Sequence, residues 1–308
     1  MKIIKGPYLQ FSDSIEMLVL WETDEPGPSR VDYGLTDEFG DHVEQTAPAM
    51  LHRVVLRALE PESTYHFHIK TGEAESDTFT FQTSVKESTP FKFAVFGDSR
   101  TSVEQSAGVG RLMASHHPRF LLHSGDLVSN GTEYDQWEEQ FFTPLSETLA
   151  RIPIFPVLGN HEQNSEHFYN FFPSGPWYSF HYGNACFIAL DTNTASGGFE
   201  PGSEQYGWLE QTLAQTNALW RIVWFHHPPY SSGSHGCSVI QREALAPLLE
   251  RYDVDMVFNG HDHIYERSFP MRTNRRDDEH GIIYTVTGGG GAPLYPVDAG
   301  EWTAFATS

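Results

Sequence analysis

Acidic, amide and imidazole side chains recur directly after short apolar runs in this sequence. Five runs end in such a motif, in the order Gly97-Asp98-Ser99-Arg100, Gly125-Asp126, Gly159-Asn160-His161-Glu162, His226-His227 and Gly260-His261-Asp262-His263. Apolar runs of this length indicate buried strands, and the carboxyl ends of such strands line the ligand crevice of an α/β sheet. We therefore expect the five motifs to bring carboxylates, an amide and several imidazoles to one place.

Donor groups of these types point to transition-metal chemistry. Asp, Asn and His together suit Mn, Fe or Zn. Structural zinc sites are usually built on thiolates, and the chain has only 2 cysteines. The donors outnumber what one ion needs, so the pattern predicts two divalent or trivalent ions that share a carboxylate.

The elements that would position these motifs change character along the chain. Residues 1–84 predict an all-β domain with strands at Ile15–Trp21, Arg30–Leu35, Leu51–Leu56, Tyr65–Ile69 and Thr78–Thr83, and with a turn at Pro26-Gly27-Pro28. Residues 85–91 predict a linker. In residues 92–308 apolar runs alternate with amphipathic stretches, which predicts an α/β domain with helices at Val103–His116, Glu133–Ala150, Glu204–Thr216 and Val239–Tyr252.

Composition excludes several classes of partner. The 308 residues include 41 Asp and Glu against 19 Lys and Arg, a net charge of -22. Such a charge repels polyanions, so we expect no binding to duplex nucleic acid or to an acidic membrane. No apolar run approaches the ~18–20 residues of a membrane-spanning helix, and residues 1–10 lack the apolar core of a signal peptide. As the sequence stands we expect a cytoplasmic protein, or a secreted or periplasmic one if a leader was removed.

Taken in order, GD, GD, GNHE, HH and GHDH resemble the calcineurin-like metallophosphoesterase superfamily. The segments GHDHIYER (260–267), HHPPYSSG (226–233) and GGGGAPLY (288–295) are similar to its purple acid phosphatase-like branch. Leu59-Glu60-Pro61 followed by Tyr65 resembles the tyrosine corner of fibronectin type III domains, with Trp21 where they keep a core tryptophan. The resemblance implies an α/β (α+β) four-layer catalytic sandwich of two mixed sheets flanked by helices, preceded by a fibronectin type III-like sandwich. From the residues themselves, another kind of β-barrel stays open for 1–84.

The resemblance also implies a set of metal ligands. A first metal would be held by Asp98, Asp126 and His263, and a second by Asp126, Asn160, His226 and His261. In this arrangement Asp126 bridges the two ions. His161, which follows Asn160 in the GNHE motif, would contact the substrate phosphoryl group. His235 would do the same, although a surface loop histidine is an equally good interpretation.

Two positions depart from the family pattern. Ser129 stands where purple acid phosphatases place a metal-binding tyrosine, which implies a protein without the purple colour, and Tyr134 is poorly placed to replace it. Arg100 stands where many superfamily members carry a further histidine ligand. An arginine is always protonated and cannot bind a cation, so Arg100 either clamps a substrate phosphate or pairs with an acidic neighbour.

These roles imply an enzyme that hydrolyses a small phosphate ester by attack of a metal-bound hydroxide. The missing tyrosine favours a broad phosphodiesterase. The alternatives are an acid-phosphatase-like phosphomonoesterase and a catalytically inactive binding or adhesion protein. A nuclease is disfavoured because the basic cluster Arg272, Arg275 and Arg276 is followed directly by Asp277-Asp278-Glu279.

Overall fold

The computed structural model describes residues 1–11, 15–193 and 198–308. The chain divides into two compact units. The first unit comprises residues 1–94, 107–121 and 142–155, and the second comprises residues 95–106, 122–141 and 156–308. The predicted domains 1–84 and 92–308, with a linker between them, divide the chain differently and stay a prediction.

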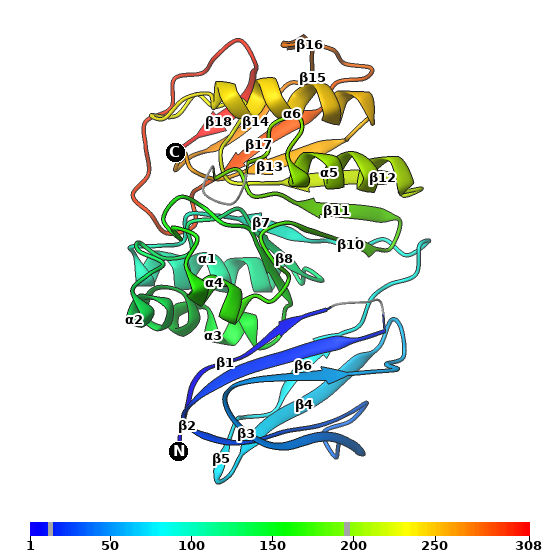
Figure 1. The fold of residues 1–308 in the computed structure, drawn as a ribbon, viewed down its shortest axis with the longest axis vertical. Coiled ribbons are helices and arrows are strands. Elements are labelled where there is room, and N and C mark those ends of the chain that lie inside the picture. The colour runs from blue at the N-terminus through cyan, green and yellow to red at the C-terminus, as the bar shows by residue number, and fades with distance from the viewer. Residues whose placement is uncertain (12–14, 194–197) are drawn as a thin grey trace. The chain divides into compact units, whose positions relative to one another are not determined.

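The N-terminal strands of the first unit form one hydrogen-bonded sheet of 6 strands (Figure 1). They are β1 (Ile3–Gln10), β2 (Met17–Gly34), β3 (Asp41–Leu56), β4 (Thr64–Thr71), β5 (Ala74–Glu75) and β6 (Phe79–Gln82). The first part of β2 pairs with β1, its last part pairs with β4, and β3 pairs with both parts. The all-β prediction is confirmed, but the predicted strands Ile15–Trp21 and Arg30–Leu35 belong to a single strand.

The turn predicted at Pro26-Gly27-Pro28 is wrong, because β2 runs through it. The register between β2 and β3 shifts between Glu22 and Gly27 and again between Gly27 and Ser29. These shifts mark a β-bulge, which bends the strand without ending it. Proline is tolerated at a bulge because the ladder hydrogen bonds are already interrupted there.

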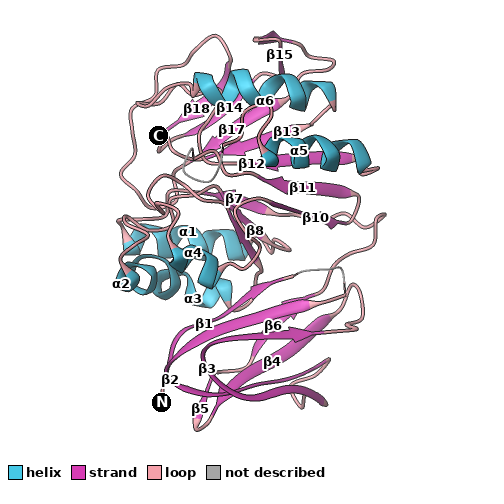
Figure 2. Cartoon of the chain, viewed as in Figure 1, coloured by secondary structure: helices cyan, strands magenta, loops and turns pink. Residues whose placement is uncertain are grey.

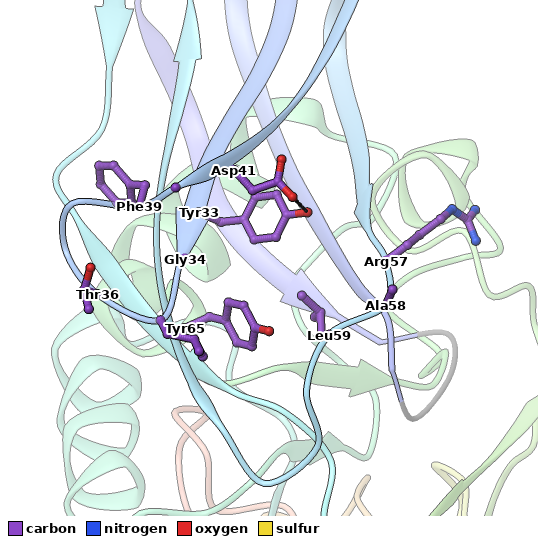
Figure 3. Close-up of a pocket in the computed structure, with 11 residues that line it drawn as sticks. Tyr33, Gly34, Thr36, Phe39, Asp41, Arg57, Ala58, Leu59 and Tyr65 are labelled. Carbon is purple, nitrogen blue, oxygen red and sulfur yellow. Dashed lines mark hydrogen bonds between the residues drawn. The ribbon is translucent and has the colours of Figure 1, made fainter.

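The predicted tyrosine corner is present in the first unit. The backbone N–H of Glu60 donates to the Tyr65 hydroxyl oxygen at 3.0 Å. Figure 3 shows Tyr65 with Leu59 and Tyr33 around a cavity of about 450 Å³, where the Tyr33 hydroxyl donates to Asp41 at 3.3 Å. The corner ties the segment before β4 to the strand itself.

A histidine is built into the core of this sheet. His52 is 1% exposed, and its ring stacks on that of the fully buried Trp21 with the centroids 4.6 Å apart. Its Nε2 lies 2.9 Å from Thr23 Oγ1 and its Nδ1 lies 2.8 Å from Ser29 Oγ. Burial lowers the pKa of His52 to about 4, so the imidazole is neutral at pH 7 with a hydroxyl partner on each nitrogen.

A mixed sheet of 7 strands dominates the second unit. Its order is β10 (Tyr178–Tyr182), β11 (Ala185–Ala189), β12 (Trp220–Trp224), β13 (Met256–Asn259), β17 (Ile283–Thr287), β14 (Tyr265–Ser268) and β18 (Thr303–Thr307). The pairs from β11 to β17 are parallel, and the pairs at both edges are antiparallel. A further sheet has the order β7 (Ala94–Phe96), β8 (Leu121–His123) and β9 (Ile154–Pro156), and β15 (Met271–Arg272) pairs with β16 (Arg275–Arg276).

The helices agree with the prediction of mixed sheets flanked by helices. They are α1 (Val103–Ser115), α2 (Tyr134–Gln136), a π-helical turn (Trp137–Phe142), α3 (Thr143–Leu149), α4 (Glu166–Phe171), α5 (Glu204–Gln215) and α6 (Val239–Arg251). α5 and α6 connect parallel strands of the large sheet (Figure 2). They share one core with it, through side chains such as Leu209, Leu248 and Val223. Within the described residues, none of the helices has the length and apolarity needed to cross a membrane.

Candidate metal centre

All six predicted metal ligands lie in the second unit, on loops that follow strands. They are Asp98 after β7, Asp126 after β8, Asn160 after β9, His226 after β12, and His261 and His263 after β13. Asp98, Asp126 and His261 have φ angles of 56°, 59° and 72°. Residues other than glycine rarely adopt this left-handed backbone, and it persists where the surrounding structure enforces it. The loops therefore hold these three ligands in set orientations.

The ligand loops are packed closely against one another, and at two glycines there is no room for a side chain. The N–H of Asp98 donates to the Gly125 carbonyl at 2.9 Å, and the N–H of His261 donates to Asp98 Oδ2 at 2.9 Å. A β-carbon on Gly159 would lie 2.1 Å from Asp126 Oδ1, and one on Gly260 would lie 2.5 Å from Asp98 Oδ2. Glycine is required at both positions because a neighbouring carboxylate occupies the space of a side chain.

One cluster of donors contains acceptor atoms that face each other. Asn160 Oδ1 lies 3.0 Å from His226 Nε2 and 3.1 Å from His261 Nδ1. His226 Nδ1 donates to the Ser124 carbonyl at 2.8 Å, so Nε2 of His226 carries a lone pair. Two lone pairs at this distance repel, and either a cation or the Nδ1 proton of His261, whose Nδ1 lies 3.2 Å from His226 Nε2, relieves the repulsion. The donors therefore fit a transition-metal ion, and we call Asp126, Asn160, His226 and His261 the second metal position.

A second cluster contains a buried oxygen that is not hydrogen-bonded. Asp98 Oδ1 has no hydrogen-bond partner among the described residues and lies 3.6 Å from His263 Nε2. His263 Nδ1 donates to the Pro293 carbonyl at 2.7 Å, which leaves a lone pair on Nε2. Burial and the nearby Asp126 carboxylate raise the pKa of Asp98 well above its usual range, and a bound cation reverses such a shift. We call Asp98, Asp126 and His263 the first metal position.

Asp126 lies between the two metal positions. Its Oδ1 is 3.5 Å from His226 Nε2, and its Oδ2 is 3.4 Å from the Nε of Arg100. The ligand atoms of Asp98, Asp126 and His226 all lie within 4.8 Å of one another. Oδ1 thus faces the second position, while Oδ2 contacts Arg100, which in turn contacts His263 of the first position.

Burial keeps the imidazoles of the site neutral, which is the form that binds metals. Burial lowers the pKa of His226 well below the usual range and that of His261 to about 2. It also lowers the pKa of His263. His227, which the sequence favours as a core or supporting residue rather than a ligand, also has its pKa lowered by burial, to about 4. Its ligand atom lies within 4.8 Å of those of His226 and His261, and its Nδ1 is 2.8 Å from Thr192 Oγ1.

Glu162 ties the ligand loops together, although no role for it was predicted. Its buried carboxylate accepts hydrogen bonds from the N–H groups of Gly159 at 2.7 Å, Leu127 at 2.8 Å and Asp126 at 2.9 Å. Burial and the Asp126 carboxylate raise the pKa of Glu162 to about 8. The available signal was its place in the Gly159–Glu162 motif, but an acid beside metal ligands suggests another ligand rather than a support.

Two of the predicted substrate-side residues lie against the ligands. His161 Nδ1 donates to the Ser129 carbonyl at 2.7 Å, and its Nε2 lies 3.8 Å from Asp126 Oδ2. The exposed ring of His235 stacks on that of His261, with the centroids 4.2 Å apart. His235 therefore lies beside the second metal position rather than on a remote surface loop.

Tyr295 lies beside the same histidines, although no role for it was predicted. Its ring stacks on that of His263 with the centroids 4.1 Å apart, and it lies 5.5 Å from the ring of His235. Its backbone N–H also donates to the carbonyl of His263 at 3.0 Å. The glycine-rich segment before Tyr295 was a signal for a loop near the site, but not for the stacking partner.

The position of the missing tyrosine is occupied by a serine that has its own partner. Both the N–H and the hydroxyl of Ser129 donate to Gln140 Oε1 at 2.9 Å. The ring of Tyr134 packs against those of His167 and Phe171, at centroid distances of 5.5 and 6.3 Å. Neither residue is arranged as a ligand of the first metal position.

The chain matches two known families of domains. Residues 91–265 match the calcineurin-like phosphoesterases, and residues 4–83 match the N-terminal domain of purple acid phosphatases. Among solved structures, a purple acid phosphatase from yellow lupin (Lupinus luteus) seeds has a TM-score of 0.83 at 20% identity and covers 98% of this chain and 67% of its own. That likeness concerns the fold.

Two relatives show the extent of the similarity. Purple acid phosphatase 15 of Arabidopsis thaliana is 29% identical over 79% of this chain and 54% of its own length. Phosphoenolpyruvate phosphatase of Allium cepa is 25% identical over 95% of this chain and 66% of its own length. The chain thus spans little more than half of the first relative and about two thirds of the second.

Proposed function

The chain belongs to the calcineurin-like phosphoesterases and carries the N-terminal domain of purple acid phosphatases, and from this membership we propose that it is a metal-dependent hydrolase of phosphate esters. The observation that carries the proposal is the pair of acceptors at the second metal position. His226 Nε2 and Asn160 Oδ1 face each other at 3.0 Å, with His261 Nδ1 beside both, an arrangement that suits a cation. Transition-metal ions suit these donors.

The proposed reaction is hydrolysis with water as nucleophile. Ions bound at the two positions would lower the pKa of a bound water and neutralise charge on the phosphoryl oxygens. In the reaction a water oxygen attacks phosphorus, the bond to the leaving oxygen breaks, and a proton goes to that oxygen. Asp126 would hold both positions at a fixed separation, because its ligand atom lies within 4.8 Å of those of Asp98 and His226.

Two histidines would act on the substrate. The Nδ1 proton of His161 is committed to the Ser129 carbonyl, so its Nε2 is free to accept a hydrogen bond or, when protonated, to donate one to a phosphoryl oxygen. His235 is exposed and lies against His261, where it can reach the leaving oxygen. We propose that these two residues stabilise the phosphoryl group and supply the proton.

We further propose that phosphodiesters are the better substrates. A monoester carries up to two negative charges, whereas a diester carries one. The cationic side chain described above, Arg100, is engaged with Asp126 and is therefore not available to neutralise a second charge on the phosphate. A second candidate is a phosphomonoesterase, which the names of the purple acid phosphatase and phosphoenolpyruvate phosphatase relatives favour.

The test is metal analysis of the purified protein together with two ester assays. Nitrophenyl phosphate and bis-nitrophenyl phosphate are compared with Mn, Fe, Zn and Co, and we expect metal-dependent hydrolysis of both with faster turnover of the diester. Asp126→Asn should abolish the hydrolysis of both esters. The matched control is Asp253→Asn, whose side chain is 77% exposed. Protein that gains no activity with any of these ions would contradict the proposal and support a binding role instead.

A further inference from the structure

The first metal position contains a cationic side chain. The Nε of Arg100 lies 3.4 Å from Asp126 Oδ2, and its Nη2 lies 3.4 Å from His263 Nε2. The side chain is 15% exposed, so water only partly screens its charge. The guanidinium group therefore contacts two of the three donors that a metal ion would need there.

These contacts use the same lone pairs as a metal ion would. His263 Nδ1 donates to the Pro293 carbonyl, so Nε2 can only accept, and Arg100 is the donor that faces it. A guanidinium group stays protonated at any ordinary pH and cannot itself be a ligand. An ion that enters the first position must displace these hydrogen bonds and meets a positive charge close by.

The first position is also the poorer in ligands. Asp98, Asp126 and His263 are its donors among the described residues, whereas the second position has four. Ser129, where a further ligand is expected from the resemblance, donates its hydroxyl to Gln140 instead. The smaller number of ligands and the nearby cation both weaken metal binding at the first position.

We propose that Arg100 competes with the metal ion at the first metal position, so that this chain holds one ion tightly at the second position and another only weakly at the first. The inference rests on the proposed function, because it concerns the same donors. It makes Arg100 a residue that sets metal occupancy rather than one that clamps a substrate phosphate. Occupancy of the first position would then depend on the free metal concentration.

The test is Mn²⁺ binding to the metal-free 308-residue chain, measured by calorimetry and by electron paramagnetic resonance. We expect the wild-type protein to show one tight site and one site at least tenfold weaker. Arg100→Gln removes the charge and should strengthen the weak site at least tenfold, with growth of the signal of a coupled Mn pair. Arg100→Lys keeps the charge and should leave the weak site weak. Arg251→Gln, at a side chain 57% exposed on α6, is the matched control and should change nothing.

Other outcomes separate this inference from the proposed function. Two sites of equal affinity in the wild-type protein, unchanged in Arg100→Gln, would overturn the inference about Arg100 but not the proposed function. Unchanged Mn²⁺ binding with a raised KM in Arg100→Gln would also overturn it and assign Arg100 to the substrate. Absence of Mn²⁺ binding in wild-type and variant proteins that are folded by circular dichroism would contradict the metal site and the proposed function together.

Discussion

His52 in the first unit and the predicted metal-binding histidines in the second unit have opposite surroundings. In the first unit each ring nitrogen of His52 has a hydroxyl partner, and the ring stacks on Trp21. In the second unit His226 and His261 turn ring nitrogens toward the side-chain oxygen of Asn160. Burial lowers the pKa of all three imidazoles. A low pKa therefore does not distinguish a metal ligand from a core residue, whereas facing acceptors do.

The strongest test of this comparison is to remove the carboxylate shared by the two metal positions. Asp126→Asn should lower ester hydrolysis at least about a thousandfold and should reduce bound metal, since both positions lose a charged ligand. His52→Gln should leave metal content unchanged. Hydrolysis assays and elemental analysis of both variants check this. Full activity and metal in Asp126→Asn would contradict the assignment.

Metal removal should destabilise the second unit and leave the surroundings of His52 unaffected. An ion at a hundred times its Kd stabilises a folded protein by about 3 kcal/mol, so a chelator should lower the free energy of unfolding by about that amount. Urea unfolding with and without chelator measures it. Asp126→Asn is the control and should respond much less, and an equal response in that variant would show that the ion binds elsewhere.

Glu162 offers a test of how far the ligands depend on their support. Glu162→Gln replaces one acceptor oxygen by an NH₂ group that faces backbone N–H donors, and supports of this kind change metal affinity by about 10–100-fold. We expect weaker Mn²⁺ binding with an unchanged number of sites. Glu243→Gln, at an exposed position on α6, is the matched control. Normal Mn²⁺ affinity in Glu162→Gln would mean that the loops hold their shape without this carboxylate.

The pH dependence of stability tests the other side of the comparison. The pKa of His52 is about 4 in the folded protein and about 6.5 when exposed. Between these values the unfolded chain binds the extra proton, so the contribution is full above pH 6.5 and is lost as pH falls toward 4. We expect the His52 contribution to lower the free energy of unfolding by about 1–2 kcal/mol when the pH falls from 7 to 5. His52→Gln should lack this part of the slope in urea unfolding, while the titration of the site histidines is common to both proteins. Identical slopes would contradict the pKa shift.

The parts of the fold and the site that follow from local patterns were predictable. The motifs of Asp98, Asp126 and Asn160 each follow an apolar run, and parallel strands place such ends together, so their meeting required no knowledge of the loops. The corner at Tyr65 is likewise a short-range feature.

The features that the sequence did not predict depend on partners far along the chain. Pro26-Gly27-Pro28 forms a bulge rather than a turn because β3 continues beside β2 on both sides of it. Tyr295 meets His263 only when the segment after β17 returns to the loop after β13. The choice between two roles for Arg100 likewise depended on the distance to Asp126, which no local pattern contains.

The close packing at Gly159 and Gly260 has a consequence for genetic variation. Neither residue has a functional group, yet a methyl group on either would overlap a ligand carboxylate. A mutational scan scored by activity would rank both glycines among the metal ligands. The number of positions at which a single substitution inactivates this protein is therefore larger than the number of residues that bind metal, and selection against variants extends to residues that take no part in the chemistry.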